Sequence, residues 1–440
     1  MIDLTEYDHE RPGRRLVIVV RADPVICGHS GEARNLAEAA LERGFDDVRI
    51  VTWPIERLEE SGLPLKPLDR VLPYSPGITV ERPPAVGDYK VPDGRYTAGM
   101  VGRLTKLFTD GVPTVCISLY LLPHAMVVNE ALMVASATGL SVDVATIAEA
   151  VGSDITNAVT TSIEEGRLGV AAHLFASYLA NDHCVAVSEY TRKLIISSAE
   201  QVDGMFGTRF AAQCRERVRV SYPAIDASAF IDLHEDDVER TLRARGLVAN
   251  GYILFLSRLT PAKGVDDLIA AYARSKAKDR VRLIIAGNGP AAGDLRRMAE
   301  VTAVGDRIRF FDDVDDTEKT HLMRASAAYA LPSKPRPEFT ETFGIALVEK
   351  MLAGGGPVIT TPTGGIPEAV GDTAVMFPAG DVPALANALD EVIIDLDDRE
   401  VRARAHEARR YAMRFDRGNV FDGLVEGIGE PSQIRLVEGL

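Results

Sequence analysis

The second half of this chain alternates between two hydrophobic patterns, and this alternation constrains its fold more than any other feature. Short runs rich in Val, Ile, Leu and Ala, typical of buried strands, are followed by stretches in which apolar residues recur every three or four positions, typical of helices. The expected strands and helices are 253–257, 282–286, 294–301, 307–311, 318–325, 328–331, 343–352 and 357–360. Such repetition predicts a parallel sheet covered by helices, which is a doubly wound, Rossmann-like domain.

The first half of the chain opens in the same way. An apolar strand is expected at 16–20, a helix at 33–43 and a second strand at 48–52, which predicts a second Rossmann-like unit. Between residues 56 and 102 the pattern dissolves into sequence rich in Pro and Gly, too long for an ordinary connection. We interpret this segment as a short hairpin followed by a loop.

A length of 440 residues exceeds the size at which a single hydrophobic core usually stops growing, so two domains are expected. The stretch 218–226 is typical of a last strand that runs into a turn, which places the junction between Pro223 and about Ala249. The predicted domains are therefore 1–230 and 231–414.

Composition excludes several classes of protein. A net charge of −15 argues against general attraction to nucleic acid or to an anionic membrane, although a local basic pocket is compatible with it. The most apolar region, 115–152, is interrupted by polar residues and never reaches the run of about 18 uninterrupted apolar residues that a membrane span needs. The acidic first residues lack the features of a signal peptide, so we expect a cytoplasmic protein.

The four cysteines are far apart in the sequence and form no pair or His/Cys cluster with the spacing of a zinc site. They are Cys27, Cys116, Cys184 and Cys214. We expect them to be reduced, mostly buried thiols.

Glu341 and Glu349 lie eight positions apart, with Phe343 and Gly344 between them where an expected strand gives way to an expected helix. The free backbone N–H groups of a helix N-terminus suit anions, and both carboxylates are able to hydrogen-bond sugar hydroxyls. The alternative is that Glu349 is a solvated helix residue and that Glu341 is only a favourable charge at the helix N-terminus.

Arg258 and Lys263 follow the expected strand 253–257. Two cations are thus placed at the carboxyl end of a strand, which is where open α/β sheets bind ligands. Downstream, the segment 363–368 (Thr-Gly-Gly-Ile-Pro-Glu) is another turn of small residues that leads into a short helix. The alternative for the two cations is a solvated loop without a ligand.

Together these motifs resemble the retaining glycosyltransferases of family 4, which have the two-domain glycosyltransferase-B fold. The resemblance is strong over 252–390, where the Arg258 and Lys263 pair, the turn 287–290 (Gly-Asn-Gly-Pro), the two glutamates and the turn 363–368 follow the family's order and spacing. In the first half it depends on 28–32 (Gly-His-Ser-Gly-Glu) and 182–191. It implies two Rossmann-like doubly wound domains that face a cleft, with the final helix, within 415–440, returning to the N-terminal domain.

The resemblance also implies residue roles. Arg258, Lys263 and Glu341 are the expected catalytic residues: the two cations neutralise the leaving diphosphate and Glu341 holds the donor sugar. Glu349 is expected to hold the nucleotide ribose. The expected donor-binding residues are Gly28, Gly31, Asn288, Val314, Thr342, Phe343, Gly344, Ile345 and Glu349.

The acceptor side departs from the family pattern. Many members carry a histidine in the stretch that corresponds to 142–149, and this chain has none there. His124 is the nearest replacement, and with Tyr120 and Glu149 it forms the predicted acceptor-binding set. The alternative for His124 is a packed core histidine, which is common for a lone histidine beside apolar residues.

Neither a metal nor a cofactor is expected. The segment 312–316 (Asp-Asp-Val-Asp-Asp) contains an Asp-x-Asp pattern that holds manganese in the other major glycosyltransferase fold. Here it follows an expected strand of the C-terminal domain, where the family reads the nucleotide base. Paired cations are expected to supply the neutralisation that a metal supplies elsewhere.

The sequence thus predicts retaining transfer of a sugar from a UDP- or GDP-sugar to a small soluble acceptor. Rich use of Arg, Ala and Asp suggests a high-GC bacterium and a role in small-molecule or antibiotic biosynthesis, with a sulfur acceptor as one hypothesis. The alternatives are a nucleotide-sugar 2-epimerase and a non-catalytic subunit that binds a sugar nucleotide. A glycoside hydrolase is disfavoured, because its two carboxyl groups must oppose each other across the bond that is cleaved. A homodimer is an open alternative to a monomer.

Overall fold

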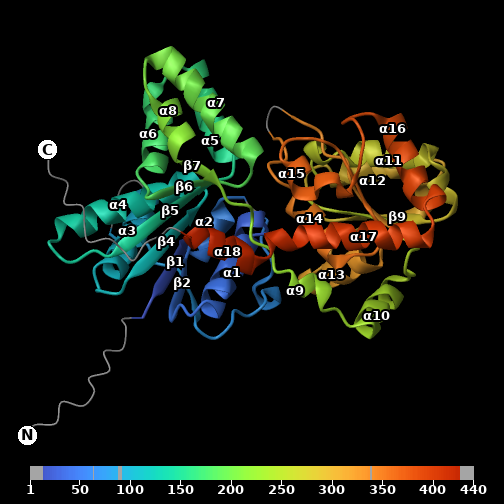
Figure 1. Ribbon diagram of the computed structural model, residues 1–440, viewed down its shortest axis with the longest axis horizontal. Coiled ribbons are helices and arrows are strands. Elements are labelled where there is room, and N and C mark those ends of the chain that lie inside the picture. Colours follow the sequence, from blue (N-terminus) through green and yellow to red (C-terminus); the bar gives the residue numbers. More distant parts are fainter. Residues whose placement is uncertain (1–12, 63, 88–91, 337–338, 427–440) are drawn as a thin grey trace, which may run out of the picture. The chain divides into compact units, whose positions relative to one another are not determined.

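The computed structural model describes residues 13–426 apart from 63, 88–91 and 337–338 (Figure 1). It divides into two compact units. The first contains residues up to Ala186, then Arg192–Ser221 and the end of the chain from Phe421, and the second contains Val187–Thr191 and Tyr222–Val420. Each unit is an α/β domain built on a parallel sheet, as predicted.

The first unit is built on a seven-stranded sheet with the order β3-β2-β1-β4-β5-β6-β7. The strands are β1 Arg15–Val19, β2 Asp47–Val51, β3 Ile78–Glu81, β4 Thr114–Leu119, β5 Val144–Ala150, β6 His183–Ala186 and β7 Val218–Val220. All neighbouring strands pair in parallel. Every residue of β1 and β4 is buried, because helices cover both faces of a doubly wound sheet.

The helices of the first unit follow the strands in chain order. They are α1 Gly28–Glu42, α2 Ile55–Glu60, α3 Pro92–Phe108, α4 Met126–Ala137, α5 Ser153–Glu164, α6 Leu168–Leu179, α7 Glu189–Phe206 and α8 Phe210–Arg217, with α18 Arg417–Val425 near the end of the chain. The first residues of α7 and α18 belong to the second unit. The ring of Phe421 packs edge-to-face on Phe45 at a centroid distance of 5.6 Å, so α18 returns to the first unit.

The predicted hairpin between residues 56 and 102 is wrong. The segment instead supplies edge strand β3, which pairs in parallel with β2, and most of α3. Its exposed edge position explains the weak apolar pattern of β3, in which no residue is fully buried. The Pro-rich sequence around it forms the connections, including a short 3₁₀ turn at Leu68–Arg70.

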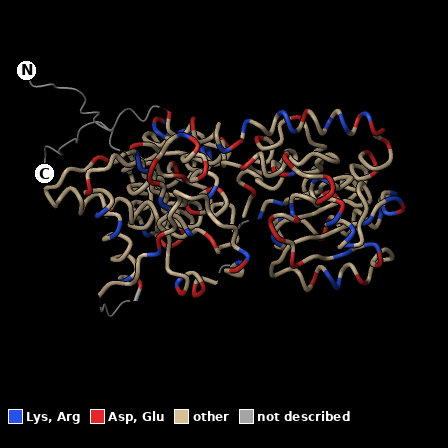
Figure 2. The backbone as a smooth tube through the Cα atoms, turned by 90° about the horizontal axis from the view of Figure 1, so that it is seen from below, with Lys and Arg blue, Asp and Glu red and all other residues tan. Residues whose placement is uncertain are grey.

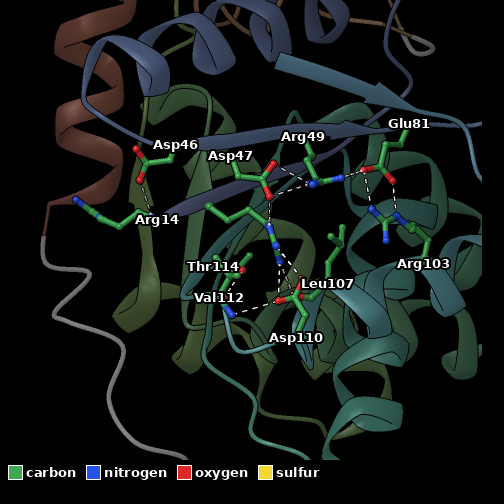
Figure 3. Close-up of polar contacts among 11 residues, drawn as sticks. Arg14, Asp46, Asp47, Arg49, Glu81, Arg103, Leu107, Asp110, Val112 and Thr114 are labelled. Carbon is green, nitrogen blue, oxygen red and sulfur yellow. Dashed lines mark hydrogen bonds and ion pairs between the residues drawn. The ribbon is translucent and has the colours of Figure 1, made fainter. Parts of the chain in front are cut away.

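A network of partly buried ion pairs lies at this end of the sheet (Figure 3). Arg15, 4% exposed, lies 2.7 Å from Asp47 and 2.8 Å from Asp110 through its guanidinium nitrogens. Glu81 receives close ion pairs from Arg49 and Arg103. Burial by itself raises the pKa of Glu81, but the hydrogen bonds from Arg103 and Arg49 outweigh it and hold the pKa below its ordinary value. The network links β1, β2, β3 and α3.

The second unit is built on a six-stranded parallel sheet with the order β10-β9-β8-β11-β12-β13. The strands are β8 Tyr252–Leu256, β9 Arg282–Ala286, β10 Ile308–Phe311, β11 Ala328–Leu331, β12 Val358–Thr360 and β13 Val375–Met376. The helices are α9 Ser228–Ile231, α10 Glu235–Arg245, α11 Val265–Arg274, α12 Ala292–Glu300, α13 Asp316–Ala325, α14 Ile345–Ala353, α15 Ile366–Val370, α16 Val382–Asp390 and α17 Asp398–Ala412. The predicted strands and helices of this half are present.

The boundary between the units differs from the predicted one. The first unit ends at Ser221 rather than at 230, and it resumes at Phe421 rather than at 415. Aromatic packing explains the difference, because the Tyr222 ring lies against Phe343 and Phe415, with centroid distances of 5.5 and 5.2 Å, in the second unit. The inclusion of residues 187–191 in the second unit was not predicted.

Figure 2 shows that Lys and Arg are interspersed with Asp and Glu along both units. Among the described residues, no helix is long and apolar enough to cross a membrane.

Candidate donor site

Lys263 and Glu341 form a close ion pair at the carboxyl ends of two neighbouring strands of the second unit. Lys263 ends a short 3₁₀ turn, Pro261–Lys263, after β8, and Glu341 lies in the segment that follows β11. The side chains are 8% and 12% exposed, so water screens the pair only weakly. The structure therefore brings together two of the three predicted catalytic residues.

A glycine makes this approach possible. Gly264 follows Lys263 with a φ of +67°, and a Cβ at this position would lie 2.0 Å from the carbonyl oxygen of Pro332. Any other residue would push the loop after β8 away from the loop after β11. The short distance between Lys263 and Glu341 thus depends on Gly264.

Arg258, the third predicted catalytic residue, is exposed on the same loop. Its guanidinium carbon lies 5.9 Å from the centre of the Phe339 ring, and the Lys263 ammonium lies 5.2 Å from the same centre. Within the described part of the chain Arg258 has no carboxylate partner, in contrast to Lys263. The Phe339 ring therefore lies near both cations, and Arg258 is the one that is available to an anion.

The segment between the two glutamates ends at a helix N-terminus. Helix α14 begins at Ile345, two residues later than predicted, because Gly344 adopts a φ of +104° and serves as the N-cap. Gly344 has no side chain to cap the first turn, so the N–H groups there have no side-chain partner from the cap position. Thr342 and Phe343 thus precede the helix, and Ile345 opens it.

The turn 363–368 packs against the backbone of the segment 341–342. A Cβ on Gly364 would lie 1.9 Å from the carbonyl oxygen of Glu341, and one on Gly365 would lie 2.0 Å from that of Thr342. The N–H of Gly365 donates to the Glu341 carbonyl at 2.9 Å. The paired glycines are needed because two backbones pass in direct contact.

Glu349 lies on α14 with its side chain 15% exposed, and its Oε1 is 2.6 Å from the ammonium of Lys319 on α13. It is therefore not a solvated helix residue. The Lys319 ammonium also lies 5.2 Å from the centre of the Phe230 ring.

The predicted residues after β9 and β10 lie in adjoining loops. The N–H of Leu259 donates to the Asn288 carbonyl at 2.8 Å, and the Asn288 amide donates to the Asp312 carbonyl at 2.6 Å. Val314 is a partly buried residue packed on the core of the second unit. The loops after β8, β9 and β10 are thus joined by hydrogen bonds at one edge of the sheet.

Three aspartates of the segment 312–316 have protein partners. Asp312 lies 3.2 Å from Arg296, Asp313 lies 2.9 Å from Arg245, and Asp315 caps α13 by accepting from the N–H of Glu318 at 2.8 Å. These contacts give the segment a structural role. The requirement for a metal is not tested by them, so metal independence stays a prediction.

In the first unit, Gly28 and Gly31 lie in the first turn of α1 and not in a loop before it. The helix begins at Gly28 rather than at 33, and its N-cap residue, Cys27, makes no side-chain capping bond. A Cβ on Gly31 would meet no atom within 4 Å, so open space surrounds this position. Their donor contacts stay predictions.

His124 is buried in the first unit, and its predicted role as an acceptor contact stays a prediction. It is 1% exposed, its Nδ1 lies 2.7 Å from the carbonyl oxygen of Leu119, and its Nε2 accepts from the indole N–H of Trp53 at 3.1 Å. A carbonyl only accepts, so Nδ1 carries the proton. Burial, with a contribution from Arg21, lowers the pKa of His124 to about 4. Both ring nitrogens are occupied, and the ring is neutral near pH 7.

Tyr120 and Glu149 are joined through the backbone, since the Tyr120 N–H donates to the Glu149 carbonyl at 3.1 Å. Tyr120 has a φ of +78°, and Arg21 lies 4.8 Å from the centre of its ring. The Glu149 side chain is 1% exposed. Burial first, and then the nearby Glu32 and Asp154 carboxyls, raise the pKa of Glu149 well above its ordinary value. Glu149 is therefore not an exposed carboxylate, although its acceptor role stays untested.

Comparison with known proteins decides the family of the second unit. The model of the family "Glycosyl transferases group 1" matches residues 243–410, which contain all the predicted catalytic residues. This segment is a group 1 glycosyl transferase domain. The match covers β8 to β13 and the helices between them.

Relatives of this group 1 glycosyl transferase domain include two curated proteins. A D-inositol 3-phosphate glycosyltransferase of Corynebacterium glutamicum is 35% identical over 202 residues, which is 44% of this chain and 46% of that protein. The phosphatidylinositol N-acetylglucosaminyltransferase gpi3 subunit of Schizosaccharomyces pombe is 31% identical over 191 residues, 43% of this chain and 41% of that protein. The chain thus spans less than half the length of these relatives.

Solved structures match over both units. HepE of Anabaena, determined in complex with UDP and glucose, has a TM-score of 0.66 at 18% identity and covers 94% of this chain and 99% of its own. WaaG, a glycosyltransferase involved in lipopolysaccharide biosynthesis, has a TM-score of 0.61 at 17% identity, with 94% and 100% covered. These likenesses confirm the predicted glycosyltransferase-B fold.

Two residues of the group 1 glycosyl transferase domain were missed by sequence reasoning. Phe339 lies in the segment after β11 next to both cations, and its only signal was an aromatic residue two positions before Glu341. Lys319 gave no signal, since a lysine in an amphipathic helix is ordinarily solvated. Only the packing of α13 beside α14 reveals its pairing with Glu349.

Proposed function

We propose that this protein transfers a sugar, with retention of the anomeric configuration, from a nucleoside-diphosphate sugar to a small soluble acceptor. The observation that carries the proposal is the buried Lys263–Glu341 ion pair, located with Arg258 at the carboxyl ends of β8 and β11 inside a group 1 glycosyl transferase domain. A cation for the diphosphate and a carboxylate for sugar hydroxyls are thus adjacent. UDP- and GDP-sugars are the first donors to test.

The cations act on the leaving group. Negative charge builds on the diphosphate as the bond from the anomeric carbon to the phosphate oxygen breaks, so a fixed cation stabilises the transition state more than the ground state. A cation at about 4 Å contributes on the order of 4 kcal/mol at an effective dielectric near 20, before desolvation is subtracted. Lys263 is held in place by Glu341, whereas Arg258 is free to close on the second phosphate.

The carboxylates act on the rest of the donor. Glu341 accepts hydrogen bonds from hydroxyls of the transferred sugar, and Glu349, oriented by Lys319, accepts from the ribose. Amides at the start of α14 face the sugar and phosphate, where the N-terminal end of a helix favours negative charge. Four predicted donor contacts, Thr342, Phe343, Gly344 and Ile345, lie between these two carboxylates.

The acceptor nucleophile attacks from the face that the diphosphate leaves. A new bond forms between the acceptor atom and the anomeric carbon, the bond to the phosphate oxygen breaks, and the acceptor proton passes to that oxygen. No protein base is needed, which agrees with the internal hydrogen bonds of His124. An acceptor that is already anionic near neutral pH, such as a thiol or thione of a bacterial small-molecule or antibiotic pathway, suits such a site.

The experiment that tests the proposal is an assay of nucleoside diphosphate release. The protein is incubated with a panel of UDP- and GDP-sugars, with and without hydroxyl and sulfur acceptors, and both free diphosphate and glycosylated product are measured. Stoichiometric release with product supports transfer. Interconversion of donors without net consumption would indicate an epimerase, and binding without turnover would indicate a non-catalytic subunit.

A further inference from the structure

Helix α7 begins in one unit and continues in the other. Its first residues, up to Thr191, belong to the second unit, whereas Arg192 and the residues after it belong to the first. The helix is 18 residues long, and the N–H groups of its first turn have no partner within the helix. The contacts that fix the first turn of α7 are therefore contacts within the second unit.

The carboxylate of Glu368 holds the start of α7. Its oxygens accept from the N–H of Glu189 at 2.6 Å and from the N–H of Tyr190 at 2.8 Å. The Tyr222 hydroxyl donates to the same carboxylate at 3.4 Å. A carboxylate at the positive end of a helix, in two hydrogen bonds to its first amides, is a strong and directional contact.

The same helix start is tied to the predicted donor segment. The hydroxyl of Ser188 donates to the carbonyl of Thr342 at 2.6 Å, and the N–H of Thr191 donates to the Ser188 oxygen at 3.0 Å. Thr342 lies directly after Glu341. Its carbonyl is also the atom against which Gly365 packs, three residues before Glu368. The start of α7, the segment 341–344 and the turn 363–368 thus form one hydrogen-bonded assembly.

We infer that Glu368 is a positioning residue, which fixes the segment 341–344 by anchoring the start of α7 beside it. The effect of this anchoring on catalysis rests on the proposed function, whereas the anchoring itself does not. Among the described residues, the Glu368 carboxylate contacts the start of α7 and the Tyr222 hydroxyl, and neither predicted cation is one of its hydrogen-bond partners. When the carboxylate is lost, the start of α7 loses two acceptors, and the Ser188 bond to Thr342 is no longer held in place.

Hydrogen exchange tests the anchoring without any need for activity. In Glu368→Gln the side chain keeps its size, but an amide N–H replaces one acceptor oxygen and faces a backbone N–H. Losing such a cap corresponds to about a tenfold rise in local opening, so exchange in 187–195 and in 340–347 is expected to rise by about that factor. Asp372→Asn is the matched control, an exposed carboxyl nearby whose loss leaves both segments unchanged. Faster exchange in 187–195 alone would overturn the inference.

Ser188→Ala tests the same link from the other side, and it keeps the inference testable if Glu368→Gln fails to fold. This variant removes the bond to the Thr342 carbonyl and is expected to speed exchange in 340–347 by a similar factor. Unchanged exchange there would overturn the link between α7 and the donor segment.

Steady-state kinetics and nucleotide binding test whether the loss of this anchor slows sugar transfer. Glu368→Gln is expected to lower kcat about tenfold while the Kd for UDP or GDP stays within about twofold, because the sugar-facing segment and not the diphosphate site is loosened. Equal losses in kcat and nucleotide affinity would contradict a positioning role. If the wild-type protein transfers no sugar, the proposed function fails, but the exchange result still decides whether Glu368 anchors α7.

Discussion

The ammonium nitrogen of Lys319 lies 2.6 Å from Oε1 of Glu349, and both side chains are largely shielded, 22% and 15% exposed. Two helices, α13 and α14, therefore meet through a charge pair at the residue predicted to hold the nucleotide ribose. A pair this shielded orients the carboxylate, because the alternative rotamers of Glu349 would leave the lysine without its partner.

A double-mutant cycle on this pair is the first prediction. Lys319→Met and Glu349→Gln are each expected to raise the donor KM about three- to tenfold with little change in kcat, because both act on binding shared by ground and transition states. The double variant should lose less than the sum of the single losses in free energy. Lys276→Met, an exposed lysine without a carboxylate partner in the described structure, is the control. Fully additive losses would show that Lys319 does not act through Glu349.

The second prediction concerns pH and His124. Its ordinary pKa is 6.5 and burial lowers the folded value to about 4, so the unfolded chain binds a proton in this range that the folded protein does not. The neutral ring thus contributes stability that is fully present above pH 6.5 and is lost as pH falls through about 4, on the order of 3 kcal/mol in total. Chemical denaturation of the wild type and of His124→Asn across this range measures the contribution.

If the ring is a core residue, the pH dependence of stability flattens in His124→Asn while the pH dependence of kcat keeps its shape. A loss of one limb of the pH–rate profile, without a change in the stability profile, would instead assign His124 to the chemistry.

The third prediction concerns metal. Excess EDTA should leave turnover unchanged, because in the proposed mechanism Lys263 and Arg258 neutralise the diphosphate without a divalent ion. The measurement compares initial rates after dialysis against EDTA with rates after addition of Mg²⁺ or Mn²⁺. A strict requirement for Mn²⁺ would contradict the proposed mechanism.

Much of the second unit could be predicted from sequence because buried parallel strands have a continuous apolar signature. The donor motifs followed from local signals, such as cations after a strand and glycines in a turn. The edge strand β3 could not be found in this way, since its pattern is only partly apolar. The lowered pKa of His124 depends first on burial, and burial of this side chain is visible only once the chain is folded.

The positions of Lys319 and Glu368 illustrate the same limit. Both are charged residues on helices, and the sequence, which marks the turn 363–368 as a motif, does not show which backbone or side chain either of them contacts. Their roles depend on packing between elements, since α13 lies beside α14 and the turn 363–368 lies beside the start of α7. Tertiary contacts of this kind carry no local pattern.

The most direct test of the central claim is the rate of nucleoside diphosphate release by Lys263→Ala, Arg258→Ala and Glu341→Ala, compared with the wild type and with Lys276→Ala as the control. Each of the first three removes an interaction with the leaving diphosphate or the donor sugar, so kcat is expected to fall at least about a hundredfold while the fold is retained, as judged by circular dichroism. The control should keep the wild-type rate. Near-normal turnover in two of the three variants would contradict the assignment of this site as the place where the sugar is transferred.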